Sequence, residues 1–414
     1  MNKKVLYISI DGMTDPLGQS QVLPYLIGLS KEGYAITLLS CDKPDRYLAH
    51  KDKIEAICTA NNIKWESTPY KNSPKLAASI ANVQRLVKIA HQLYQENHFD
   101  LVHCRSYLPM FAGISLKKKY GVKLLFDIRG FWPDERVDGG LWNLKNPIWR
   151  FIYKYFKEKE AYFFSQADHV ISLTQNAKDE IHSWNLTESP IPIDVIPCCA
   201  DLDLFNYEPI TVNEQNELLS KLNLNQSDFI ITYLGSLGTY YGIDDMLQLF
   251  KRAQLKYKNA KFLIITASDP NIVWDKIKEL NISKEDIRVT KANRDQVPLH
   301  LSLSKFSLVF YKENFSRKAC SPTKIGELLG LGVPFICSPN IGDTSAIAED
   351  TNSGVTISGF DEQSYDGAIE TINKIIETPK LSIREGGFKY FDLNEGIKKY
   401  KKTYSSLMQK IKLQ

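Results

Sequence analysis

Residues 315–339 read FSRKACSPTKIGELLGLGVPFICSP, and the rest of the chain is organised around this stretch. Ser321 suits the N-cap of a helix, and Pro322 suits the first helical position. Gly332 and Pro334 should end the helix. The apolar residues 333–337 then predict a short buried strand. The stretch is therefore expected to be a helix that leads directly into a strand.

Charged side chains cluster near the start of this expected helix. Arg317 and Lys318 precede it, and Lys324 and Glu327 lie in its first two turns. A helix N-terminus offers unpaired N–H groups and a positive dipole end, and nearby cations add to its attraction for phosphate. Glu327 could accept hydrogen bonds from a ribose diol. From the spacing alone, an ordinary capped helix that feeds a strand is an equally good interpretation.

Composition limits the classes of protein to consider. The chain has 414 residues, 43% of them hydrophobic, which favours two or three domains with well-filled cores. A net charge of +4 does not indicate a nucleic-acid-binding surface. The seven cysteines include no Cys-x-x-Cys pair and no metal-ligand spacing, as expected for reduced thiols in a cytosolic protein. The N-terminus shows neither a signal-peptide core nor a membrane span. We expect a soluble intracellular protein.

The first half of the chain alternates predicted strands and helices, which predicts an α/β fold with Rossmann-like topology. Strands are expected at the apolar runs 5–10, 35–41, 64–70, 100–105, 123–126, 167–173 and 194–197. After the first strand, a loop through Gly18 and Gln19 leads to a helix expected at 21–32. A strand, glycine loop and helix in succession can bring N–H groups to a phosphate or sugar. Since no Gly-x-Gly-x-x-Gly is present, a plain Rossmann-like start is the simpler interpretation.

Polar residues gather where two of these strands end. His103 and Arg105 end the strand at 100–105, and Asp127 and Arg129 follow the strand at 123–126, with Trp132 close behind. The carboxyl ends of strands are where open α/β sheets bind ligands. The pattern favours a functional role for Asp127 and Arg129, which could orient a substrate. The alternatives are a structural histidine and a salt bridge that braces the loop.

The segment 146–166 predicts a helix that is both aromatic and basic. Such a helix can lie on a membrane surface. A core helix with one solvated face fits the same pattern equally well. The sequence therefore leaves peripheral membrane contact open.

The second half repeats the α/β pattern. Strands are expected at 229–234, 260–266, 287–290 and 307–311, with a helix from residue 243 and another from Val297. Gly235 and Ser236 open a second glycine loop after the first of these strands. The chain should end in a basic helix at 395–412.

The motif Ser-Pro-Thr-Lys-Ile-Gly-Glu-Leu-Leu-Gly-Leu-Gly-Val-Pro at 321–334 resembles the donor-binding signature of family-four retaining glycosyltransferases of the GT-B fold. The resemblance implies that Ser321, Thr323 and Lys324 contact a nucleotide sugar and that Glu327 binds its ribose. Many members carry a first glutamate at the position of Ala319.

Further positions carry over from the same resemblance. The loop with Gly18 and Gln19 would touch donor and acceptor, and the segment from Val289 to Lys291 would seat the nucleobase. Members usually have an arginine and a lysine where this chain has Ser236 and Tyr241, so the diphosphate would depend on Arg317, Lys318 and Lys324. The Asp127 position often holds a histidine. The Asp-x-Arg-x-x-Trp-Pro version resembles transferases for amino-deoxy sugars.

The resemblance covers nearly the whole chain and implies two Rossmann-like domains facing across a cleft. The expected domains are an acceptor domain at 1–204, a donor domain at 205–385, and a C-terminal helix at 386–414 that crosses back onto the first domain. The implied catalytic residues are Asp127, Arg129 and His103, and Arg105, Trp132 and Gly235 would contact substrate.

The implied function is transfer of a sugar from a nucleotide diphosphate sugar to a carbohydrate or lipid-linked acceptor, with retention of configuration, in cell-surface glycan synthesis. No cofactor or metal is expected, since a helix dipole and cations would stabilise the departing phosphate. The leaving phosphate itself would accept the acceptor's proton. Two alternatives stay open: a nucleotide-sugar 2-epimerase of the same fold, and a non-catalytic sugar- or nucleotide-binding protein.

Overall fold

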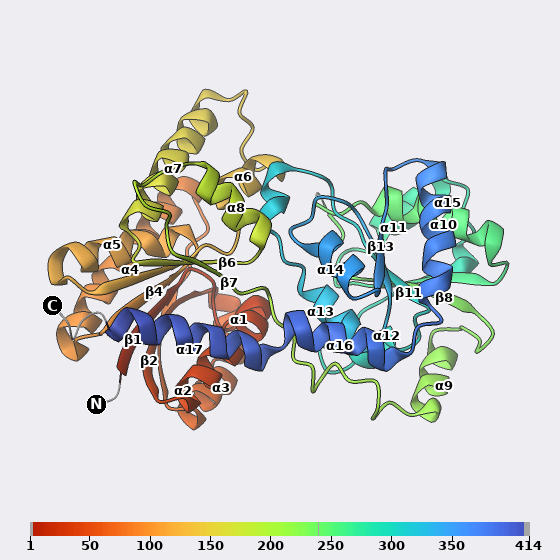
Figure 1. Ribbon diagram of the computed structural model, residues 1–414, viewed down its shortest axis with the longest axis horizontal. Helices are drawn as coiled ribbons and strands as arrows, with labels where there is room; N and C mark the ends of the chain where they lie inside the picture. Colours follow the sequence, from red (N-terminus) through yellow and green to blue (C-terminus); the bar gives the residue numbers. More distant parts are fainter. Residues whose placement is uncertain (1–2, 239, 410–414) are drawn as a thin grey trace. The chain divides into compact units, whose positions relative to one another are not determined.

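The computed structural model describes residues 3–238 and 240–409, which form two compact units. The N-terminal unit comprises Met1–Val137, Leu141–Pro197 and Leu393–Gln414, and the C-terminal unit comprises Asp138–Gly140 and Cys198–Asp392. Figure 1 shows a central sheet with helices around it in each unit. The division falls after Pro197, whereas the sequence suggested a boundary near Leu204. The segment expected at 386–414 is divided as well, because its first residues group with the C-terminal unit.

The N-terminal unit is built on a parallel sheet in the order β3-β2-β1-β4-β5-β6-β7. Its strands are β1 (Lys3–Ser9), β2 (Tyr34–Asp42), β3 (Ile63–Pro69), β4 (Leu101–Arg105), β5 (Lys123–Asp127), β6 (His169–Ser172) and β7 (Ile193–Val195). Its helices are α1 (Pro16–Gln21), α2 (Leu23–Lys31), α3 (Pro44–Ala60), α4 (Lys75–Asn97), α5 (Tyr107–Tyr120), α6 (Trp132–Asp138), α7 (Pro147–Gln166), α8 (Gln175–Ser183) and α17 (Leu393–Gln409). The last five residues of β1 are all buried, as expected for a strand covered on both faces.

The C-terminal unit has a second parallel sheet, in the order β10-β9-β8-β11-β12-β13. Its strands are β8 (Phe229–Leu234), β9 (Ala260–Ile265), β10 (Ile287–Thr290), β11 (Phe306–Val309), β12 (Phe335–Cys337) and β13 (Gly354–Thr356). Its α-helices are α9 (Val212–Lys221), α10 (Ile243–Lys256), α11 (Asn271–Glu279), α12 (Val297–Leu301), α13 (Thr323–Gly330), α14 (Thr344–Asp350), α15 (Glu362–Ile375) and α16 (Lys380–Phe391). Two 3₁₀ turns, η1 (Lys284–Asp286) and η2 (Phe315–Ala319), complete the unit.

Strand geometry explains the core of the C-terminal unit. Successive side chains of a strand point to opposite faces. Accordingly, Phe262 and Ile264 of β9 belong to one apolar cluster, and the alternating Leu263 and Ile265 belong to another. Both faces of the sheet are therefore packed, and polar groups reach ligands only at strand ends and in loops.

Several expected boundaries are wrong for local reasons. Gly18 and Gln19 lie within α1 rather than in an open loop. The helix expected to begin at Pro322, after an N-cap at Ser321, begins one residue later at Thr323, with Pro322 as its N-cap. The Ser321 hydroxyl does not cap the helix; it accepts a hydrogen bond from the backbone N–H of Cys198 at 3.1 Å. The Ser321 hydroxyl therefore bonds to Cys198, which is distant in sequence, instead of to an N–H group of the helix.

Among residues 3–238 and 240–409, no helix is long and apolar enough to cross a membrane. The seven cysteines are present as thiols. In the same residues, no group of three or more His, Cys, Asp or Glu side chains could hold a metal ion.

Candidate functional site

The first candidate site lies at the start of α13 in the C-terminal unit. Close packing fixes this helix: a Cβ on Gly326 would lie 2.8 Å from the Cβ of Phe391, and a Cβ on Gly330 would lie 2.6 Å from the carbonyl oxygen of Phe205. Since only glycine permits these approaches, the helix is held firmly against α16 and the segment before β8. Lys324 and Glu327 are buried on this helix, with exposed fractions of 9% and 7%.

Lys324 is a buried cation with no hydrogen-bond partner for its Nζ among the described residues. The Nζ lies 4.5 Å from the ring centroid of Tyr233, 5.1 Å from that of Tyr241 and 5.3 Å from that of Tyr311. Burial lowers the pKa of Lys324 to about 8, although Glu327 and Cys320 favour the charged form. The ammonium group is thus available for an anion that the chain itself does not supply.

Gly235 is needed beside this lysine. It adopts φ +139°, and a Cβ at this position would lie 2.8 Å from the Nζ of Lys324. A larger residue would push the ammonium group away from the loop. Ser236 is exposed, and its carbonyl oxygen accepts a hydrogen bond from the Tyr233 hydroxyl at 2.6 Å.

Glu327 lies one turn beyond Lys324 and has a cationic partner that the sequence did not suggest. The Nη1 of Arg294 is 3.3 Å from its Oε1. Burial raises the pKa of Glu327, and Arg294 and Lys324 counteract the effect. Position 294 carries no sequence signal of its own, since it lies in an exposed loop between β10 and α12.

Arg317 approaches the same region from η2 and is buried, with 7% exposure. Its guanidinium stacks 4.6 Å from the ring centroid of Tyr240, and its Nε is buried without a hydrogen-bond partner among the described residues. The backbone N–H of the preceding Ser316 donates to the Asp138 carboxylate at 3.0 Å. Lys318 points outward: it is exposed, and its Nζ lies 5.3 Å from the ring of Phe315.

The remaining residues expected in this site are less engaged. Thr323 is half-buried as the first residue of α13, and Lys291 is exposed just after β10. Of the expected C-terminal residues, the structure brings Lys324, Glu327 and Gly235 together around one position, with Arg317 near by.

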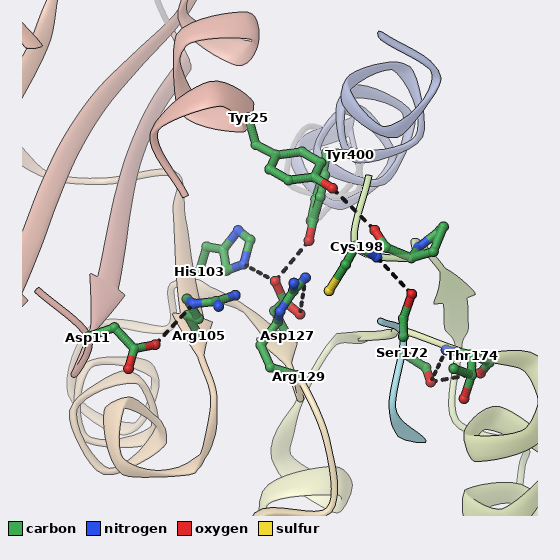
Figure 2. A network of polar contacts seen from close by, with 12 residues as sticks. Asp11, Tyr25, His103, Arg105, Asp127, Arg129, Ser172, Thr174, Cys198 and Tyr400 are labelled. Atoms are coloured by element: carbon green, nitrogen blue, oxygen red, sulfur yellow. Dashed lines mark hydrogen bonds and ion pairs between the residues drawn. The ribbon is translucent and has the colours of Figure 1, made fainter. Parts of the chain in front are cut away.

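The second candidate site lies at the ends of β4 and β5 in the N-terminal unit (Figure 2). Asp127 is 1% exposed, and its Oδ2 accepts hydrogen bonds from the Tyr400 hydroxyl at 2.8 Å and from His103 Nε2 at 3.4 Å. The Nδ1 of His103 is 2.7 Å from the Tyr404 hydroxyl, which donates to it when the ring proton is on Nε2. Tyr400 and Tyr404 stand one turn apart on α17. Sequence reasoning missed both.

The charges around Asp127 explain its acidity. Burial alone would raise the pKa of this carboxyl, but Arg129, His103 and Arg105 outweigh it and lower the pKa to about 2. Burial also lowers the pKa of His103, and Asp127 only partly opposes this, so the imidazole is neutral near pH 7. Oδ1 of this buried carboxylate has no hydrogen-bond partner among the described residues, so Asp127 positions its neighbours through Oδ2.

Two arginines lie beside Asp127. Arg129 places Nη1 3.7 Å from Asp127 Oδ1 and adopts φ +55°, a left-handed conformation that is strained for a residue with a side chain. Arg105 places Nε 3.3 Å from Asp11 Oδ2, and its Nη1 is buried without a hydrogen-bond partner in the described chain. Figure 2 shows both guanidinium groups at the edge where β4 and β5 end.

Three other expected residues have evident packing roles. A Cβ on Gly18 would lie 2.3 Å from the Gly12 carbonyl oxygen, and the Gln19 side chain donates to the Thr14 carbonyl oxygen at 3.2 Å. Trp132 packs in an aromatic cluster, 5.3 Å from Trp142 between ring centroids. These side chains hold the loops in which they lie.

Comparisons with known proteins agree with this architecture. Residues 22–204 match the model of Glycosyltransferase Family 4. No curated protein sequence matches the chain. A glycosyltransferase from Rickettsia africae ESF-5 aligns with 98% of this chain and 99% of its own, with a TM-score of 0.72 and 14% identity.

Two further solved structures show the range of proteins with this fold. Anabaena Alr3699/HepE, solved in complex with UDP, aligns with 97% of this chain and all of its own, with a TM-score of 0.67 and 13% identity. A putative UDP-N-acetylglucosamine 2-epimerase from Listeria monocytogenes aligns with 99% of this chain and 98% of its own, with a TM-score of 0.62 and 13% identity. The expected GT-B fold is confirmed.

Proposed function

We propose that the protein is a glycosyltransferase that transfers a sugar from a nucleotide diphosphate sugar, with retention of anomeric configuration; the GT-B fold and the match of residues 22–204 to the Family 4 model support this. One observation carries the proposal. A buried cation without a partner, Lys324, stands one helical turn from a buried carboxylate, Glu327. A nucleoside diphosphate offers the matching groups, a charged diphosphate and a ribose diol.

The diphosphate is assigned to Lys324 and the start of α13. The first N–H groups of a helix have no partners within the helix, and its dipole favours negative charge. Arg317 is the second cation we assign to this role, since its Nε is buried and unpaired. Together these groups stabilise the negative charge that develops on the leaving phosphate without a metal ion. Glu327, held by Arg294, accepts hydrogen bonds from the ribose.

Retention follows if the acceptor attacks from the face that the phosphate leaves. The leaving phosphate oxygen then takes the proton from the acceptor hydroxyl, the bond from the sugar to phosphate breaks, and the new glycosidic bond forms on the same face. No side chain of the chain needs to act as a base in this scheme.

The acceptor is assigned to the N-terminal unit, at Arg105 and Arg129. Guanidinium groups bind hydroxyl, carboxylate or phosphate groups through a fixed fork of donors. Asp127 and His103 act here as positioning residues, because Asp127 Oδ2 and both ring nitrogens of His103 are engaged with Tyr400, Tyr404 and each other. The acceptor class we propose is a carbohydrate or lipid-linked glycan in cell-surface polysaccharide synthesis.

Exposed side chains on α7 support a peripheral position on the inner face of the membrane. Ile148 is 60% exposed and Phe151 72%, and the neighbouring Arg150 and Lys154 are exposed too. Apolar and basic groups on one exposed segment suit an anionic lipid surface. Binding to vesicles containing an anionic lipid should weaken in a Phe151→Ser variant; equal binding would remove this part of the proposal.

Incubation with a panel of UDP- and GDP-sugars tests the activity itself. Slow release of nucleoside diphosphate, or transfer to an added glycan, is expected for a transferase, and NMR of the product gives its anomeric configuration. Conversion of one nucleotide sugar into its 2-epimer would establish the epimerase instead. Tight binding without release over hours would establish a binding protein.

A further inference from the structure

Three tyrosine rings surround the ammonium group of Lys324, and they come from three separate segments. Tyr233 is in β8, Tyr241 is in the turn before α10, and Tyr311 follows β11. Ring centroids are 5.1 Å apart for Tyr241 and Tyr311 and 6.3 Å apart for Tyr233 and Tyr241. We call Tyr233, Tyr241 and Tyr311 the tyrosine cage. Because three separate segments of the C-terminal unit each contribute one ring around the same cation, the cage is part of the tertiary structure of this unit.

The ring of Tyr233 is held in place by its own hydroxyl. This hydroxyl donates to the carbonyl oxygen of Ser236 at 2.6 Å, so its polar end is satisfied and the ring is available to Lys324. The face of an aromatic ring carries negative charge density and attracts a cation within about 6 Å of the centroid. All three cage distances to the Nζ fall within that limit.

The cage stands in for a counter-ion. Besides the three tyrosines, the titratable groups that act on Lys324 are Glu327 on the same helix and Cys320 before it. Arg317 in η2 acts on the cage residues Tyr241 and Tyr311. Glu327 makes its ion pair with Arg294. No carboxylate of the described residues bonds to the Lys324 Nζ, which is buried and unpaired. The Lys324 ammonium group is therefore buried, and it contacts the faces of three tyrosine rings rather than hydrogen-bond acceptors.

We propose that the tyrosine cage keeps Lys324 in position, without a hydrogen-bond partner, to bind the diphosphate of the donor. We also propose that donor binding is coupled to protonation of this lysine. The inference rests on the proposed function, because it takes a nucleoside diphosphate as the ligand at Lys324. The cage keeps the ammonium group unpaired and in place until the diphosphate arrives. The diphosphate then supplies the hydrogen bonds and the opposite charge that the chain withholds.

The coupling has a definite sign. With its pKa near 8, Lys324 is largely neutral in the free protein above pH 8. A bound diphosphate favours the ammonium form, so the lysine must take a proton from solvent when the ligand binds. Proton uptake should be about 0.1 per ligand at pH 7 and about 0.9 at pH 9, from the pKa near 8 and a bound lysine that stays charged. Affinity should fall about tenfold per pH unit above pH 8.

Tyr241 offers the best test of the cage, because it is the least buried of the three. Tyr241→Phe keeps the ring face, so its pH profile should keep the wild-type midpoint. Tyr241→Leu removes the face and leaves the lysine buried, so the affinity should begin to fall at a lower pH. A general loss of packing would weaken binding at every pH and leave the midpoint unmoved.

Isothermal titration calorimetry with UDP and with GDP between pH 7 and 9.5, in two buffers of different ionisation enthalpy, gives both affinity and proton uptake. Uptake that rises toward one proton in the wild type, vanishes in Lys324→Met and shifts to lower pH in Tyr241→Leu supports the proposal. Nucleotide binding with no uptake at pH 9, or an unchanged midpoint in Tyr241→Leu, overturns it. If neither nucleotide binds at any pH, the proposed function itself fails and the inference falls with it.

Discussion

Replacing Asp127 by asparagine should remove a specific, pH-dependent part of the stability of the N-terminal unit. The carboxyl is 1% exposed, and its pKa is lowered to about 2 in the folded chain from an ordinary value of 3.8. Because the folded pKa lies below the unfolded one, the carboxylate stabilises the fold above about pH 4, and this contribution is lost as the pH falls toward 2. The difference between these two pKa values corresponds to about 2 kcal/mol at pH 6.

The magnitude at lower pH follows from the same two pKa values. At pH 3 the carboxyl is largely protonated in the unfolded chain and still largely ionised in the folded one. Its contribution to the free energy of unfolding is then about 1 kcal/mol. The difference in stability between the wild type and Asp127→Asn should therefore shrink by about 1 kcal/mol from pH 6 to pH 3.

Urea denaturation followed by tryptophan fluorescence suits this measurement. The chain has six tryptophans, and all except Trp274 lie in the N-terminal unit. Tyr400→Phe is a useful companion variant, since it removes one hydrogen bond to the carboxylate and should cost about 1 kcal/mol at both pH values.

Two results would refute this reasoning. If the stability difference for Asp127→Asn is the same at pH 6 and pH 3, the carboxyl does not titrate in the expected range. If the stability difference is below about 0.5 kcal/mol at pH 6, the charges of Arg129 and Arg105 are not balanced by this carboxylate.

Two further variants probe the C-terminal unit. Glu327→Ala should weaken binding of the nucleoside diphosphate by about 1.5–3 kcal/mol, the usual scale for charged hydrogen bonds, and unchanged affinity in calorimetry would remove Glu327 from the site. Gly326→Ala should lower stability to urea by about 1–3 kcal/mol, because the new Cβ would lie 2.8 Å from the Cβ of Phe391. Its matched control is Gly367→Ala in α15, which meets no atom within 4 Å and should stabilise the unit by about 0.5–1 kcal/mol; similar losses in both variants would disprove the packing argument.

Local patterns in the sequence predict much of the fold. The apolar runs at β8 (Phe229–Leu234) and β10 (Ile287–Thr290) match the observed strands to the residue, because a buried parallel strand needs little beyond a short apolar run. The start of α13 was placed one residue early. Ser321 has the right side chain for a cap, but folding gives its hydroxyl to Cys198. Local preference yields here to a partner that only the folded chain brings near.

The sequence did not predict the hydrogen-bond partners in either candidate site, because they are distant in sequence and only folding brings them near. Tyr400 lies 273 positions from Asp127, and Arg294 lies 33 positions from Glu327. Neither has a spacing that marks it. The i, i+4 placement of Tyr400 and Tyr404 on an amphipathic helix was a visible signal for packing, but not for a bond to a buried acid.

The central claim is that Lys324 binds the diphosphate of a nucleotide donor, and Lys324→Met tests it most directly. Methionine fills a similar volume without charge, so the variant should fold at least as well once the buried cation is gone. Calorimetry at pH 7 compares a nucleoside diphosphate with its nucleoside, for both uridine and guanosine. We expect the diphosphate that binds the wild type to lose about 10- to 100-fold in affinity and the matching nucleoside to bind unchanged. Equal affinity of the variant and the wild type for the diphosphate, or equal losses for diphosphate and nucleoside, would contradict the account.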